Sequence, residues 1–95
     1  MVRNIYGYLD QYHVPPNLSG YGLLVRLIQL SLEGDKVSIE THMETLAKDT
    51  GVSSARIRGR IRYALTLSSI KDEPGVKGFV CTAVNKLQQA EHNYV

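Results

Sequence analysis

LAKDTGVSSARIRGRIR, residues 46–62, has the residue spacing of two helices that cross steeply around a short turn. Where two such helices nearly touch, the side chain has to be small, and Ala47 occupies that position. Gly51 can adopt the positive φ that ends the first helix, and Ile57 points back between the helices. The spacing predicts a helix-turn-helix over about residues 40–66, although an ordinary helical hairpin has the same pattern.

The second helix of this pair, over about residues 54–68, carries four arginines. At roughly 100° per residue, its apolar side chains form one stripe, whereas Ala55 and Gly59 point the opposite way. The outward face is therefore small at its centre and basic at its rim, a shape that suits the major groove of DNA. From Thr50 to Lys71 there are five positive residues and no Asp or Glu, so local partners for the arginines are lacking.

We predict that DNA is contacted by this helix and by the turn before it. Arg58 and Arg62 are the candidates for base edges, Gly59 allows close approach of the backbone, and the serines and Lys48 would bind phosphates. The predicted DNA-binding residues are Lys48, Ser53, Ser54, Arg56, Arg58, Gly59, Arg60, Arg62 and Tyr63. For each arginine, a solvated or salt-bridged surface position is the alternative.

Outside this pair, apolar residues keep helical spacing and no strand pattern is present. Further helices are predicted over residues 2–12, from 16 or 17 to 33, and over 76–91. The second of these segments is apolar almost all round, so it should be the central helix. Ser38 or Thr41, and later Ser53 or Ser54, are the expected N-caps. We predict an all-α bundle of five or six helices in a single domain over residues 1–95.

The composition limits the possible functions. The net charge is only +2 over 95 residues, so affinity for nucleic acid has to come from uneven charge distribution. Cys81 is the single cysteine, and its place in the apolar pattern of the last helix predicts a buried thiol. The apolar run Leu23 to Leu32 is too short for a membrane span, so we expect a soluble, cytoplasmic protein.

No residues have the spacing of a catalytic or metal site. His13, His42 and His92 are far apart in sequence, and no His or Cys lies at metal spacing from them. The carboxylates near helix starts are better explained by stabilisation of exposed backbone N–H groups. We therefore predict that the protein is not an enzyme and has no metal, cofactor or small-molecule substrate.

Three segments also carry a likeness to a known family over nearly the full length. They are HVPPNLSGYGLL at 13–24, METLAKDTGVSSARIRGRIRYAL at 43–65 and FVCTAVNKL at 79–87. With them the chain resembles the C-terminal DNA-binding effector domain of the sporulation-initiation response regulators of spore-forming Firmicutes. The resemblance implies an all-α fold and promoter binding, with the second helix of the motif in the major groove. It also implies two copies side by side on one site, as tandem copies or a homodimer.

The chain departs from this family at two positions that determine DNA specificity. Arg56 and Arg62 coincide with family arginines, but Arg58 stands where the family usually has a glutamate and Gly59 where it has a base-reading arginine. The family's target sequence is therefore not carried over. The phosphoacceptor receiver domain is not part of this sequence, so we expect no phosphorylation control of the usual kind within it.

Two functions follow from the sequence. The first is a sequence-specific DNA-binding domain of a transcriptional regulator. The alternative is a protein-interaction module that retains the bundle and modulates a related regulator without reading DNA. Such a module would use its apolar last helix or its tyrosine-rich first helix.

Overall fold

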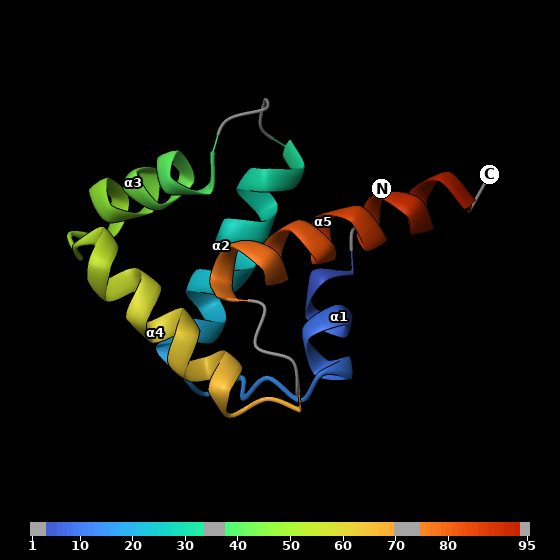
Figure 1. The fold of residues 1–95 in the computed structure, drawn as a ribbon, viewed down its shortest axis with the longest axis horizontal. Helices are drawn as coiled ribbons and strands as arrows, with labels where there is room; N and C mark the ends of the chain where they lie inside the picture. The colour runs from blue at the N-terminus through green and yellow to red at the C-terminus, as the bar shows by residue number, and fades with distance from the viewer. Residues whose placement is uncertain (1–3, 34–37, 70–74, 94–95) are drawn as a thin grey trace.

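Helix α2, Ser19–Glu33, runs through the middle of the molecule and contacts all four other helices (Figure 1). The computed structural model describes residues 4–33, 38–69 and 75–93. Apolar side chains cover most of the circumference of α2, so its burial requires neighbours on several sides. Its buried apolar residues are Tyr21, Leu23, Leu24, Val25, Leu27, Ile28 and Leu32. The prediction of a central, buried second helix is confirmed.

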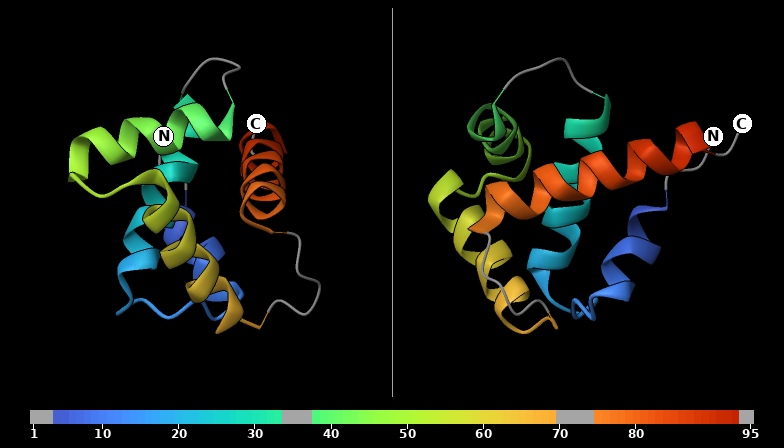
Figure 2. Two further views of the ribbon diagram at one scale, coloured as in Figure 1. Left: turned by 60° about the vertical axis from the view of Figure 1, so that its left-hand side comes forward. Right: turned by 45° about the vertical axis from the view of Figure 1, so that its right-hand side comes forward.

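The other four helices surround α2. Helix α1, Ile5–Gln11, lies on one side of it, and α3, Ile39–Thr50, and α4, Ser54–Thr66, lie on the other (Figure 1). Helix α5, Gly75–Asn93, crosses in front of α2 (Figure 2). Every helix contributes at least one side chain with no exposed surface: Leu9, Leu24, Leu46, Ile57 and Val80. The described residues form five helices and no strand, so the all-α prediction is confirmed.

Short-range signals fix the ends of α3 and α4. The Ser38 hydroxyl accepts a hydrogen bond from the Thr41 N–H at 3.2 Å, so Ser38 is the N-cap of α3. Gly51 ends this helix with φ +73°, the left-handed conformation that glycine adopts without steric cost. The Ser53 hydroxyl then accepts from the Arg56 N–H at 3.3 Å and begins α4. Of the two expected caps for each helix, the first serine is the one used.

The end of α1 has a feature that the sequence did not indicate. His13 has φ +57°, its N–H bonds to the Asp10 carbonyl at 3.0 Å, and the Val14 N–H bonds to the Leu9 carbonyl at 3.2 Å. This is the Schellman arrangement, in which a left-handed residue satisfies the last carbonyls of a helix. Val14 and Leu9 are both buried, so the same turn packs the chain onto the core.

Aromatic rings and two hydrogen bonds connect α1 and its C-cap to α5 and to the residues that follow α4. Phe79 of α5 lies 6.0 Å, between ring centroids, from both Tyr8 and Tyr12. The Tyr12 carbonyl accepts from the N–H of Ser69 at 2.8 Å and from its hydroxyl at 2.9 Å. Residues just after α4 are therefore attached to the residue that caps α1.

The backbones of α2 and α4 approach each other closely at Gly20. A Cβ placed on Gly20 would collide with the backbone carbonyl of Arg60, whose carbon would lie only 2.7 Å away. It would also lie 3.2 Å from the Ala64 Cβ. Because nothing larger than glycine fits at this crossing, Gly20 sets how deeply α4 sits on the central helix.

Two details differ from the sequence predictions. Helix α2 begins at Ser19, because residues 15–18 first form a turn in which the Leu18 N–H bonds to the Pro15 carbonyl. Cys81 is exposed, because it lies on the opposite side of α5 from the buried Val76, Phe79, Val80 and Ala83. In the described part of the chain, no helix combines the length and apolarity that a bilayer span requires.

Candidate nucleic-acid interface

Helix α4 is buried along one narrow strip only. Ile57, Ile61 and Ala64 have no exposed surface, and they lie within one side of the helix because of their spacing. Ala55 and Gly59 are exposed on the opposite side, as the sequence predicted. A Cβ placed on Gly59 would meet nothing within 4 Å, so the space above it is open. The helix therefore presents a face with small residues at its centre to solvent.

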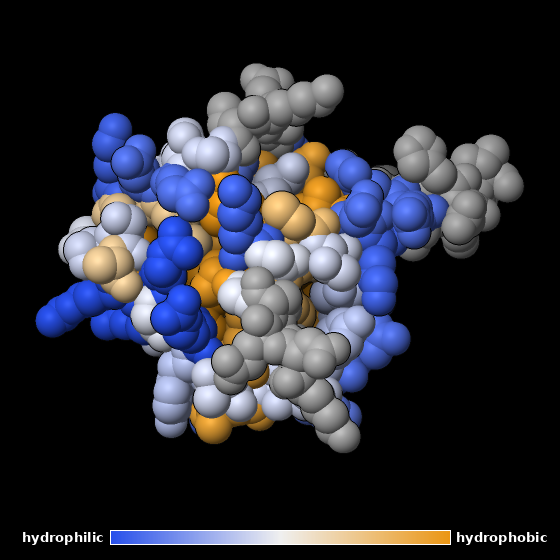
Figure 3. Space-filling model, viewed as in Figure 1, coloured by the Kyte–Doolittle hydropathy of each residue, from blue (hydrophilic) through white to orange (hydrophobic). Residues whose placement is uncertain are grey.

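The four arginines divide between the two flanks of α4. Residues four positions apart share a helix face, so Arg56 and Arg60 lie on one flank, and Arg58 and Arg62 lie on the other. Arg56, Arg60 and Arg62 are exposed, whereas Arg58 is half-buried. Figure 3 shows strongly hydrophilic side chains gathered over α3 and α4. The basic rim predicted from the sequence is thus present on both sides of the small central residues.

The flank with Arg56 and Arg60 borders a hollow between α4 and the beginning of α2. Its volume is about 460 Å³. Its lining consists of Leu18, Ser19 and Gly20 from one side and Arg56, Gly59, Arg60 and Tyr63 from the other. The close crossing at Gly20 forms this hollow, since it brings the first turn of α2 against the middle of α4.

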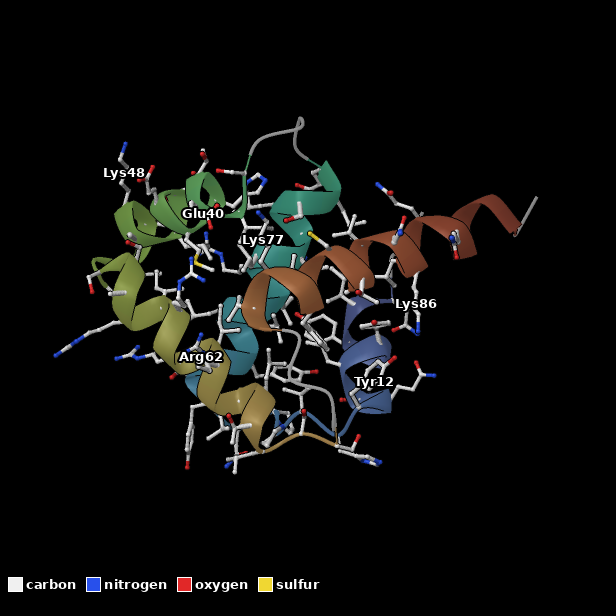
Figure 4. The ribbon with its side chains drawn as sticks, in the orientation of Figure 1. Tyr12, Glu40, Lys48, Arg62, Lys77 and Lys86 are labelled. Carbon is white, nitrogen blue, oxygen red and sulfur yellow. The ribbon has the colours of Figure 1, made fainter. Side chains whose placement is uncertain are left out.

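On the other flank, Arg58 has an acidic partner. Its Nη2 atom lies 3.5 Å from Oε2 of Glu40 in the first turn of α3. A hydrogen bond from the backbone N–H of Glu40 lowers the pKa of its carboxyl, and the positive charges of Lys77 and Arg58 lower it further. Figure 4 shows Glu40 on α3 beside Lys77 on α5. The partner of Arg58 thus comes from outside the acid-free segment between Thr50 and Lys71.

The remaining arginines of α4 lack such partners. Among the side chains described at residues 4–33, 38–69 and 75–89, no acidic group forms an ion pair with Arg56, Arg60 or Arg62. In contrast, Arg26 of α2 pairs with Asp49 at 2.7 Å. Three exposed guanidinium groups on one helix therefore have their hydrogen-bond donors available for an external anion.

The other predicted DNA-binding residues lie around the junction of α3 and α4. Lys48 is exposed in the last turn of α3 and is labelled at the outer end of that helix in Figure 4. Ser53 and Ser54 are exposed at the start of α4, where the Ser53 hydroxyl oxygen already caps the helix. The O–H group of Ser53 can still donate a hydrogen bond to a phosphate. The predicted residues thus occupy one continuous part of the chain, with Arg58 turned toward α3.

Sequence analysis missed four residues that shape this surface. Leu18, Ser19 and Gly20 form the far wall of the hollow, and Glu40 binds one of the arginines. Each is brought to α4 by helix packing, which local spacing does not determine.

The positive charges of this surface allow it to bind a polyanion. The open space at Gly59 allows another molecule to come close to the α4 backbone. Comparisons with protein families, characterised proteins and solved structures find no match to this chain.

Proposed function

We propose that this chain is a sequence-specific DNA-binding domain of a transcriptional regulator. In this proposal α3 and α4 form a helix-turn-helix, and α4 enters the major groove. The observation that carries it is the exposed side of α4, where small residues lie between exposed arginines without acidic partners in the described chain. The resemblance to sporulation-initiation effector domains, carried by residues 13–24, 43–65 and 79–87, supports the same function.

The proposed contacts follow from the position of each side chain. Lys48, Ser53 and Ser54 lie where the turn before a recognition helix crosses the phosphate backbone. Arg62 would reach a base edge, because it is exposed and free of ion pairs within the described residues. The open space at Gly59 would let the α4 backbone approach the bases.

Arg58 would have to exchange Glu40 for DNA in order to read a base. The exposed fractions of the two side chains are 38% for Arg58 and 55% for Glu40, so water screens their attraction. A solvent-screened ion pair of this kind is weaker than a bidentate contact between arginine and guanine. We therefore keep Arg58 as a second candidate for a base contact. Whether it leaves Glu40 depends on the base that faces it.

The test is selection of bound duplexes from a random-sequence library, at several salt concentrations, with Arg62→Ala and Arg58→Ala/Arg62→Ala in parallel. We expect one enriched motif, steep weakening by salt, and loss of the motif in the double variant. Arg62→Ala alone should weaken specific binding by about 1–3 kcal/mol, which is roughly 5-fold to 150-fold. Helical circular dichroism should be unchanged, since Arg62 is exposed.

The same experiment identifies the competing function. A folded protein that retains no duplex at low salt would refute DNA binding and favour the protein-interaction module. If DNA is bound, the enriched site tests the expected tandem copies or homodimer. Two half-sites separated by about one helical turn would indicate two copies side by side.

A further inference from the structure

The hollow beside α4 combines positive charge with apolar surface. Arg56 and Arg60 lie one helical turn apart, and neither forms an ion pair with the described residues. Leu18 and the ring of Tyr63 provide apolar surface in the same hollow. The hydroxyl groups of Ser19 and Tyr63 can donate hydrogen bonds. Such a lining suits a ligand that alternates anionic and apolar groups along its length.

The sugar-phosphate backbone of DNA is such a ligand, because each phosphate is followed by a deoxyribose. The major groove is about 12 Å wide and a helix with its side chains measures about 10–12 Å across. A helix inserted there necessarily has one strand along each flank. The flank with Arg56 and Arg60 is also the one that borders the hollow.

We propose that this hollow holds the sugar-phosphate backbone of one DNA strand, and that the start of α2 is thereby part of the interface. This proposal rests on the proposed function. Arg56 and Arg60 bind consecutive phosphates, Tyr63 and Leu18 pack on the deoxyribose between them, and Ser19 donates to a phosphate oxygen. The contact is independent of base sequence, so it sets the depth and orientation of α4 in the groove.

Ser19 provides the test, because it lies on α2 and outside the helix that would read the bases. Ser19→Glu places a negative charge in the hollow, while an acidic residue in the first turn of a helix is compatible with folding. Ser19→Arg adds a positive charge at the same position. The control is Gln29→Glu, an equal charge change on an exposed position of α2 about 15 Å along the helix, beyond the Debye length.

Affinity is measured for the selected site and for a random duplex over a salt series. We expect Ser19→Glu to weaken both by roughly tenfold and to make the logarithmic salt dependence shallower by about one unit. Ser19→Arg should strengthen binding to both duplexes several-fold and make the logarithmic salt dependence steeper by about one unit. Gln29→Glu should bind like the wild type.

Replacement of single phosphates by neutral methylphosphonates then tests for a direct contact. At one or two adjacent positions, the replacement should weaken the wild type more than Ser19→Glu, because the carboxylate in that variant already repels these phosphates while Arg56 and Arg60 still bind them. If Ser19→Glu binds like the wild type at every salt concentration, while Arg58→Ala/Arg62→Ala still loses the motif, this inference is wrong and the proposed function stands. Absence of any duplex binding by the wild type would overturn both.

Discussion

Gly20 shows how one residue fixes the position of the proposed reading helix. Gly20→Ala should destabilise the protein by about 1–3 kcal/mol, because the added methyl group overlaps the Arg60 carbonyl. The matched control is Gly22→Ala in the same helix, where a Cβ meets nothing within 4 Å. That substitution should stabilise the protein by about 0.5–1 kcal/mol, since alanine favours the helix. Urea denaturation followed by circular dichroism measures both, and equal effects would refute the close crossing.

Glu40 gives a prediction for acid stability. Its pKa is lower in the folded protein than its ordinary value of 4.5, so its contribution is present above that value. The contribution is lost as the pH falls through the lowered pKa of the folded state. Glu40→Gln should therefore lower the melting temperature near neutral pH and leave it almost unchanged at acidic pH below the lowered pKa of the folded state. A difference that is equally large at both pH values would assign Glu40 a role other than its charge.

Single residues also show which features of the structure can be predicted from the sequence and which cannot. The exposed positions of Ala55 and Gly59 could be predicted, because they depend only on angles around one helix. The same geometry places Cys81 away from the buried stripe of α5, although its apolar neighbours suggested burial. The pairing of Arg58 with Glu40 could not be predicted, since it requires the relative position of two helices.

At the scale of the elements, α4 has to be both stable and able to approach DNA. Gly59→Ala should stabilise the protein by about 0.5–1 kcal/mol, because the added methyl group meets open space and alanine favours the helix. It should also weaken DNA binding by about tenfold, comparable to loss of one base contact, because the methyl group lies on the approaching face. Gly22→Ala is the control, with a similar gain in stability and unchanged affinity. Unchanged affinity in Gly59→Ala would mean that α4 does not approach through this face.

The elements themselves were largely predictable, because their ends depend on short-range chemistry. Ser38, Gly51 and Ser53 each act within a few residues of their own position. Helix α2 begins later than the sequence predicts, since the turn at residues 15–18 also satisfies backbone groups without being helical. The left-handed His13 was missed, because glycine is the usual residue there and nothing local marks a histidine.

The whole molecule determines the candidate interface through the way α2 supports α4. Composition and spacing were sufficient for an all-α fold with a buried second helix. They were not sufficient for the hollow, whose walls are distant in sequence and meet only where the helices cross. The candidate residues within 48–63 could therefore be chosen from the sequence, whereas the α2 residues that line the hollow could be identified only from the structure.

The position of a positive charge should matter more for DNA binding than the net charge of the molecule. Arg62→Gln and Lys86→Gln lower the net charge of +2 equally, but they lie in different regions of the molecule (Figure 4). Lys86 of α5 donates to the Tyr12 hydroxyl at 3.4 Å, on the side of α1, whereas Arg62 lies on the exposed side of α4. Arg62→Gln should weaken specific binding by about 1–3 kcal/mol, and Lys86→Gln should leave it within about twofold. Fluorescence anisotropy with the selected duplex measures both affinities. Equal losses would mean that net charge alone attracts DNA, and α4 would then have no special role in binding.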